Sequence, residues 1–236
     1  ADRLAAAERA NRELVDKAAR WQADREQRFE GTPLVGESVV FLVDMSGSME
    51  KADQNTASPN KWPAVCDTVA KLMASVPTLA RYQVVVFSKS ARWLVGGEDW
   101  QVYKGQESVA TVRAELGKIR PMDGTNLYAG FELAFKLHPK GLDTIYLFSD
   151  GLPNIGPGLS PAQVAMVPPL EESRQAEILG RYTREQLRTT WNPQKPGGRP
   201  VRINSIGFYF ETPELGAFLW AISRENNGNF VGMCRP

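Results

Sequence analysis

Residues Ser38–Glu50, S-V-V-F-L-V-D-M-S-G-S-M-E, combine a buried strand pattern with a polar turn. Val39–Val43 is an unbroken apolar run rich in β-branched residues, which is typical of a strand covered on both faces. Directly after it, Asp44, Ser46 and Ser48 place one carboxylate and two hydroxyls on the turn that leaves the strand. Because open α/β sheets bind their ligands at the carboxyl ends of strands, we expect a binding site here.

Oxygen donors of this kind suit a hard divalent cation, but one short loop supplies too few of them to fill an octahedral shell. Two later segments offer further donors. Asp143–Gly151, D-T-I-Y-L-F-S-D-G, is a second buried-strand pattern that ends in the carboxylate of Asp150. In M-D-G-T-N-L-Y-A-G, Thr125 follows Gly124 on a loop that opens a helix. Alone, each of these residues would be interpreted as a cap or turn residue; together they predict a metal site.

At these positions the sequence resembles the von Willebrand factor A domain with its metal-ion-dependent adhesion site. The family pattern is D-x-S-x-S, then a separate Thr, then a strand-terminal Asp followed by Gly, and all five positions match. The resemblance covers about Gly36–Gly232. It implies an α/β fold with a doubly wound, mostly parallel central sheet and helices on both faces, and strands that alternate with helices along the chain indicate the same class.

The resemblance also implies how the site residues share the ion. Ser46, Ser48 and Thr125 would bind it directly, whereas Asp44 and Asp150 would act through water or alternate between the two modes. With no carboxylate in direct contact the ion stays electrophilic, so that a Glu or Asp of another protein can complete its coordination. Mg²⁺ fits best because it prefers six oxygens and retains water, and Mn²⁺ or Ca²⁺ could replace it.

Three classes of function are open. The first, which we favour, is a metal-dependent protein-binding module without enzymatic activity. The second is a scaffold or oligomerisation unit that acts through an N-terminal helix and carries a structural metal. The third is a Mg²⁺-dependent phosphohydrolase, because D-M-S-G-S superficially resembles phosphatases that use a strand-terminal Asp as nucleophile. Those sites need a second Asp where Ser46 stands, and a Lys on a separate strand-end loop, so this interpretation is the weakest.

The Gly- and Pro-rich run G-L-P-N-I-G-P-G-L-S-P follows Asp150, beside the predicted ion. Loops this long in compact domains are usually functional or mobile, so we expect Leu152–Pro161 to influence partner choice. Glu50 and Asp123 are further acids near the site. We expect them to be solvated rather than to bind the ion.

The composition argues against several other functions. The 28 basic and 27 acidic residues give a formal charge of +1, so we predict no nucleic-acid partner. His138 is the single histidine, which removes a His-rich zinc site and a Ser-His-Asp triad. The longest apolar run is far below the ~18 residues that span a bilayer. Because the sequence begins at Ala1 without Met, we expect a removed leader or an excised piece. A membrane anchor outside these residues stays open, and the localisation leans towards a membrane-associated or extracytoplasmic site.

Ala1–Glu30 predicts one long charged helix, without Gly or Pro and with apolar residues at three-and-four spacing. We treat it as a unit separate from the domain at 31–236. One interpretation is a coiled-coil stalk with Asn11 as a polar seam position. The other is a helix docked on its own domain. Family members usually add a final helix after the last strand, and this sequence stops at Pro236, so the N-terminal helix would cover the vacant sheet face.

The remaining elements follow from periodicity and turn residues. We expect strands at 82–87, 91–95, 201–208 and 229–232, and helices at 61–76, 108–119 with Ser108 as its cap, 127–135, 169–191 and 214–225. Cys66 and Cys234 are the only thiols. Cys66 lies on an apolar helix face, where we expect a free buried thiol; a disulfide with Cys234 is the alternative.

Overall fold

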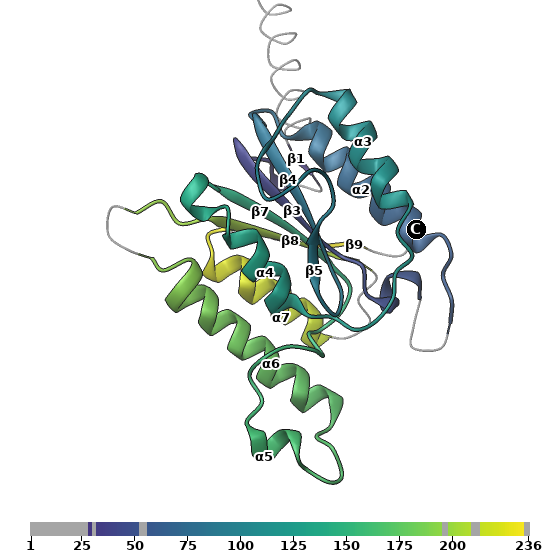
Figure 1. Cartoon of the computed structure of the whole chain (residues 1–236), viewed down its shortest axis with the longest axis vertical. Coiled ribbons are helices and arrows are strands. Elements are labelled where there is room, and N and C mark those ends of the chain that lie inside the picture. The colour runs from purple at the N-terminus through teal and green to yellow at the C-terminus, as the bar shows by residue number, and fades with distance from the viewer. Residues whose placement is uncertain (1–27, 30–31, 52–55, 195–197, 209–212, 234–236) are drawn as a thin grey trace, which may run out of the picture.

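The computed structural model describes residues 28–29, 32–51, 56–194, 198–208 and 213–233. Within them a seven-stranded sheet has the order β5-β4-β3-β7-β8-β9, and β6 also pairs with β4 (Figure 1). Its strands are β3 (Ser38–Asp44), β4 (Arg81–Phe87), β5 (Ala91–Trp93), β6 (Gln101–Val102), β7 (Thr144–Ser149), β8 (Arg202–Phe208) and β9 (Phe230–Met233). The β4, β3, β7, β8 and β9 strands are parallel, whereas β5 and β6 run antiparallel to β4. The predicted mostly parallel sheet is confirmed.

Helices cover both faces of this sheet (Figure 1). The first face carries α2 (Lys61–Ser75) and α3 (Gln106–Gly117), and the second carries α4 (Leu127–Phe135), α6 (Glu172–Gln186) and α7 (Pro213–Glu225). The side chains of β3 alternate between the two cores: Val39, Phe41 and Val43 join the cluster with α2 and α3, whereas Val40 and Leu42 join the cluster with α4 and α7. A strand buried on both faces is the reason for the unbroken apolar run.

The parallel register brings the predicted site segments to one edge of the sheet. Val43, next to the end of β3, lies opposite Phe148 of β7, so that both strands end at nearly the same level. The loop that precedes α4 is held there as well, because the backbone N–H of Asn126 donates to the carbonyl of Ser88, just after β4, at 2.7 Å. The expected position at the carboxyl ends of the strands is therefore observed.

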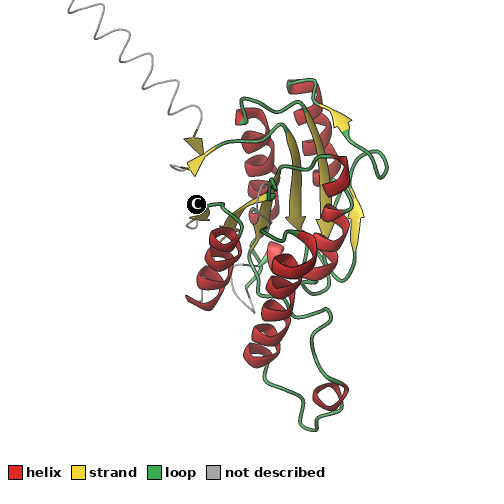
Figure 2. Ribbon diagram, turned by 90° about the vertical axis from the view of Figure 1, so that its left-hand side faces the viewer, coloured by secondary structure: helices red, strands yellow, loops and turns green. Residues whose placement is uncertain are grey.

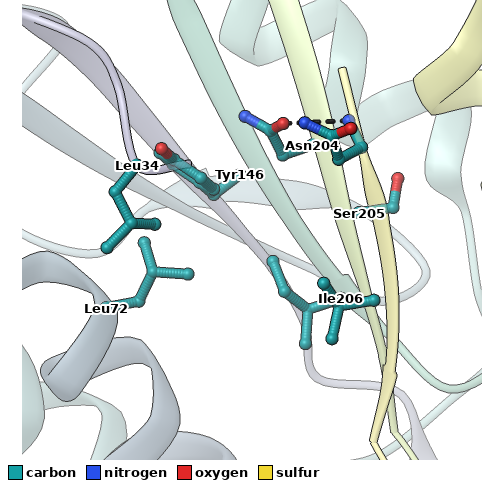
Figure 3. A pocket seen from close by; sticks show the side chains of 8 residues that line it. Leu34, Leu72, Tyr146, Asn204, Ser205 and Ile206 are labelled. Carbon is teal, nitrogen blue, oxygen red and sulfur yellow. Dashed lines mark hydrogen bonds between the residues drawn. The ribbon is translucent and has the colours of Figure 1, made fainter. Parts of the chain in front are cut away.

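On the first face, α2 and α3 are the helices that pack over the sheet in the described part of the chain. Near β8 and β9 this face holds a small cavity (Figure 3), lined by Leu34, Leu72, Tyr146, Asn204, Ser205, Ile206, Asn229 and Val231. Asn204 accepts a hydrogen bond from the backbone N–H of Asn229 at 3.0 Å, while its buried Nδ2 has no partner among the residues that the structure describes. The expected docking of an N-terminal helix over this face falls on residues outside the described ranges, and it stays a prediction.

The predicted helix Ala1–Glu30 needs one correction. Arg28–Phe29 is not helical but forms β1, which pairs antiparallel with β2 (Thr32–Pro33). Residues 1–27 and residue 30, with the coiled-coil alternative, lie outside the described residues, and the division at residue 30 remains an expectation.

Other boundaries shift by a few residues. The α3 helix begins at Gln106 with Gly105 as its N-cap, and Ser108 lies inside the first turn, where its Oγ accepts from the backbone N–H of Lys104 at 3.0 Å. The predicted cap at Ser108 was therefore wrong. The helix expected at 169–191 begins at Glu172, and its last turn is a π-helix, η3 (Leu187–Trp191). The described part of the chain also contains three short elements: the 3-10 helices η1 (Gly47–Glu50) and η2 (His138–Lys140), and α5 (Pro161–Val164).

Cys66 is a free, buried thiol on α2, as expected. Burial, and after it the charge of Asp67, raises the pKa of the Cys66 thiol to about 11, so it stays protonated at neutral pH. Cys234 lies outside the described residues. Across the described ranges, no helix combines the length and the apolar character that crossing a membrane requires.

The turn between α7 and β9 passes close to the backbone of β8, so we predict that Gly228→Ala destabilises the fold. A Cβ at Gly228 would lie 1.8 Å from the carbonyl oxygen of Ile203, and a backbone atom cannot move aside cheaply. We expect a loss of roughly 3 kcal/mol in the free energy of unfolding, measured by urea denaturation. The control is Gly117→Ala, because a Cβ there meets no atom within 4 Å. Equal unfolding midpoints for the two variants would contradict the prediction.

Candidate metal centre

The turn that leaves β3 folds back on its own carboxylate. Asp44 Oδ1 accepts from the backbone N–H of Ser46 at 2.8 Å, and η1 begins at the next residue, Gly47. The backbone N–H of Gly47 donates to the carbonyl of Asp123 at 3.0 Å, which joins this turn to the loop before α4. As a result, the hydroxyls of Ser46 and Ser48 lie 3.0 Å apart. The sequence D-x-S-x-S thus becomes a compact group of oxygen atoms.

The end of β7 meets this turn through two side-chain hydrogen bonds. The hydroxyl of Ser48 donates to Asp150 Oδ1 at 2.7 Å, and the hydroxyl of Ser149 donates to Asp44 Oδ2 at 2.7 Å. Because Ser48 gives its only proton to Asp150, the proton between the two serine hydroxyls belongs to Ser46. The protons therefore point along a path from Ser46 through Ser48 to Asp150, and lone pairs on both hydroxyls remain free for a cation.

Thr125 comes from the third segment and is 3% exposed. Its backbone is held by Asn154: the N–H of Thr125 donates to Asn154 Oδ1 at 2.8 Å, and its carbonyl accepts from the N–H of Asn154 at 3.0 Å. A Cβ at Gly151 would lie 3.3 Å from Thr125 Oγ1 and 3.7 Å from Ser48 Oγ. Both hydroxyls therefore border the space beside Gly151. In the described part of the chain, the hydroxyl of Thr125 has no hydrogen-bond partner, which leaves it available as a ligand.

The structure therefore brings all five predicted residues to one place, whereas the two additional acids stay outside it. Glu50 and Asp123 are exposed, as expected for solvated neighbours. Asp123 has a positive φ of 64°, and it contributes its backbone carbonyl rather than its carboxylate to the turn.

The electrostatics of the site are set by two buried carboxylates. Asp44 is fully buried, and burial, followed by the nearby charge of Asp150, raises its pKa to about 7. The hydrogen bonds from Ser149 and Ser46 act in the opposite direction and offset part of this effect. A positive charge beside Asp44 would favour its ionised form, so the site is suited to a cation.

Lys61, which the sequence analysis did not select, supplies a positive charge to the other carboxylate. It is the first residue of α2, and its Nζ donates to Asp150 Oδ2, to the carbonyl of Ser48 at 3.1 Å and to the carbonyl of Lys51 at 2.9 Å. No local pattern distinguishes this lysine from a solvated one. Asn154 was missed for a similar reason, since it lies in a Gly- and Pro-rich loop where an Asn normally indicates a turn.

The chemistry of the donors fits a hard divalent cation. The described residues contain no group of three or more His, Cys, Asp or Glu side chains placed to hold a metal. An ion at this place would therefore need hydroxyl ligands as well as carboxylates. Three hydroxyls and two carboxylates, all oxygen donors, lie at this edge of the sheet, and two of the hydroxyls border the space beside Gly151. Mg²⁺ and its hard relatives prefer this donor set.

Comparison with known families agrees with this geometry. Residues 39–152 match the family model described as von Willebrand factor type A domain. The matched A-domain region is just under half of the chain and contains all five candidate ligands. A search of curated proteins found no match.

Solved structures share the A-domain fold at low sequence identity. The PilB minor pilin from Streptococcus sanguinis is 17% identical with a TM-score of 0.55, covering 88% of this chain and 58% of that one. A von Willebrand factor type A protein from Catenulispora acidiphila is 19% identical with a TM-score of 0.55, covering 87% and 39%. Proximal thread matrix protein 1 from the mussel byssus, with a zinc-occupied metal-ion-dependent adhesion site, is 17% identical with a TM-score of 0.52, covering 85% and 42%. This chain thus spans about 40–60% of the length of these proteins.

The space beside Gly151 provides a test of where a cation binds. In Gly151→Ala the added methyl group would press on the hydroxyl of Thr125 and would occupy the space next to the hydroxyl of Ser48, so we expect the affinity for Mn²⁺ to fall by about tenfold in isothermal titration. Stability in chelator should stay within about 1 kcal/mol of the wild type, because both contacts exceed 3.0 Å. Gly97→Ala is the matched control, since a Cβ there meets nothing within 4 Å. Unchanged Mn²⁺ affinity in Gly151→Ala would exclude this space as the binding position.

Proposed function

We propose that this chain is a metal-dependent protein-binding module. Ser46, Ser48 and Thr125 would hold a divalent cation directly, and Asp44 and Asp150 would act on it through water. The observation that carries the proposal is the continuous hydrogen-bonded path from Ser46 through Ser48 to Asp150, with the free hydroxyl of Thr125 near it. Mg²⁺ is the expected ion, and Mn²⁺ or Ca²⁺ could replace it, because hydroxyl, carboxylate and water oxygens suit hard cations.

The residues of the site are arranged for an acidic ligand from outside. Ser46 and Ser48 direct their protons towards Asp150, so their lone pairs stay available. Both carboxylates are already engaged: Asp44 accepts two hydrogen bonds, and Asp150 is bound by Ser48 and Lys61. A bound ion would supply an electrophilic position that a Glu or Asp of the partner completes. We therefore propose a partner protein with an accessible acidic residue.

The segment after Asp150 is proposed to influence partner choice. It leads to α5, which lies at the tip of a loop that projects from the body of the protein (Figures 1 and 2). Around this tip three large apolar side chains are exposed: Val164 at 70%, Met166 at 46% and Val167 at 94%. Apolar side chains that are exposed together are typical of contact surfaces. We expect the partner to present an apolar patch beside its acidic residue.

Two alternative functions are supported less well. A phosphohydrolase would need an Asp nucleophile that reaches phosphorus, but Asp44 is fully buried and both its oxygens accept hydrogen bonds. Generic phosphatase assays with Mg²⁺ would test this alternative. A scaffold function depends on the predicted N-terminal helix, which lies outside the described ranges. Its test is the mass in solution with and without residues 1–30, because an unchanged monomer would contradict it.

We propose a membrane-associated or extracytoplasmic location. The likeness of the fold to a minor pilin motivates this proposal. Fractionation of cells that express the full-length protein would test it. Recovery in the cytoplasmic fraction alone would contradict it.

The hydroxyl of Thr125 allows a test of metal dependence that leaves the fold intact. Thr125→Val keeps the β-branched shape and removes a proposed direct ligand. We expect Mn²⁺ affinity to fall by at least about tenfold, because even the loss of a residue that only supports a metal ligand has an effect of this size. The immobilised wild-type chain should retain partner proteins in Mg²⁺ but not in EDTA. The Thr125→Val variant should lose this Mg²⁺-dependent retention. Asp44→Ala is expected to abolish the same ion-dependent retention, because it removes a buried charge of the site.

Thr144→Val is the matched control for Thr125→Val. Thr144 is also buried, but it lies at the first residue of β7, at the opposite end of the strand from the site. The control should bind Mn²⁺ and partner proteins normally. If Thr125→Val and Asp44→Ala both retained partners normally, or if retention by the wild type were equal in EDTA, metal-dependent binding would be refuted.

The apolar tip should affect partner binding and not metal binding. We expect Met166→Ser with Val167→Ser to weaken partner retention by about tenfold or more, because exposed apolar area would no longer be buried in the complex. Mn²⁺ affinity should remain that of the wild type. Val102→Ser is the control, since Val102 is also 70% exposed but lies on β6, away from this loop. Equal retention by the tip variant and the control would argue against a contact at the tip.

A further inference from the structure

Lys61 is a buried lysine whose ammonium group faces the metal centre. The whole residue is 3% exposed, and the side chains of Lys61 and Asp150 in this ion pair are 4% and 2% exposed. Among the described residues, the ammonium group of Lys61 donates to the carboxylate of Asp150 and to the carbonyls of Ser48 and Lys51. The pair thus joins the start of α2, the turn after β3 and the end of β7.

A lysine is rarely buried without such partners, because removing an ammonium group from water costs several kcal/mol. Lys61 precedes Trp62, and with Val65 these residues form the buried side of α2. An apolar residue would suit this helix position better if packing were the only requirement. We therefore attribute the lysine at this position to its ion pair with the carboxylate of Asp150.

The ion pair with Lys61 reduces the negative charge that Asp150 can offer to a cation. One oxygen of Asp150 accepts from Ser48 and the other accepts from Lys61, so its negative charge is already compensated inside the protein. Without Lys61, the two carboxylates would neutralise a divalent ion by themselves. With Lys61, these three described side chains and the same ion would carry one excess positive charge, which one carboxylate from outside can balance.

We propose that Lys61 is a positioning residue that serves as the counter-charge of the metal centre, a role that rests on the proposed function. It holds Asp150 away from direct coordination and keeps the Ser48–Lys51 turn in place. The ion is then bound by hydroxyls and water, and it retains the charge that attracts an acidic residue of the partner. Lys61 thereby lowers the affinity of the site for the bare ion and raises the affinity of the bound ion for an acidic ligand.

The test is Lys61→Met, which keeps the length of the side chain and removes its charge. With Asp150 deprived of its counter-charge, we expect Mn²⁺ to bind at least about tenfold more tightly in isothermal titration. The rise in Tm on adding Mg²⁺ should exceed that of the wild type, whereas the Tm in EDTA should be lower. A residue with a merely structural role would give the opposite result, because a loosened site binds metal more weakly.

Two further variants complete the experiment. Lys71→Met is the matched control, since Lys71 lies on the same helix and is exposed; it should match the wild type in every measurement. Lys61→Gln removes the charge while it keeps a hydrogen-bond donor, and it replaces Lys61→Met as the test if the latter does not fold. Unchanged or weaker Mn²⁺ binding in the Lys61 variant would overturn the role of Lys61.

The outcomes also separate this inference from the proposed function. Metal binding by the variant but not by the wild type would refute the proposed function and support Lys61 as the charge that governs the site. Metal binding by neither protein would overturn both. Tighter Mn²⁺ binding together with weaker Mg²⁺-dependent retention of partner proteins is the result that supports both.

Discussion

Two carboxylates at the ends of neighbouring parallel strands are the constraint on which the rest of the site depends. Asp44 and Asp150 are buried, and a buried carboxylate is costly unless hydrogen bonds or an opposite charge compensate it. Serine hydroxyls from both strand ends and the ammonium group of Lys61 provide this compensation. The same contacts fix the turn after β3, the start of α2 and the end of β7 relative to one another. Stability and the shape of the site therefore have one physical origin.

The sheet makes this arrangement possible because its register is fixed on both faces. A slip of one residue would exchange the α2 side of β3 with the α4 side and would expose charge to the core. The strand ends are also tied to the loops beside them: the backbone N–H of Met45 donates to the carbonyl of Phe87 at 2.7 Å, and that of Met122 donates to the carbonyl of Met45 at 3.0 Å. The hydroxyls thus belong to a rigid framework, which favours precise positioning of ligands.

The sequence was sufficient for those features that depend on local patterns. The apolar run of β3 and the alternation of strands and helices predicted the sheet, and the five polar positions predicted which residues meet at its edge. Long-range contacts could not be predicted in this way. Lys61 lies 89 residues from Asp150, and Asn154 lies 29 residues from Thr125, so neither pairing leaves a periodic signal. Local competition explains the smaller errors: Gly105 rather than Ser108 caps α3, because Ser108 bonds backwards from inside the first turn.

Lys61 compensates only one of the two carboxylates, so a cation at the proposed site would stabilise Asp44 more than Asp150. Its ammonium group contacts Asp150, whereas Asp44 has hydrogen bonds alone. The pKa of Asp44 is accordingly raised to about 7, first by burial and then by Asp150, so that its charged form is poorly stabilised without an ion. A cation beside the serine hydroxyls would remove this penalty through Asp44, while Asp150 remains occupied by Lys61. Under the proposed function the two carboxylates would have different tasks. Asp44 would favour the ion, whereas Asp150, already paired with Lys61, would leave the charge of the ion available to an acidic residue of a partner.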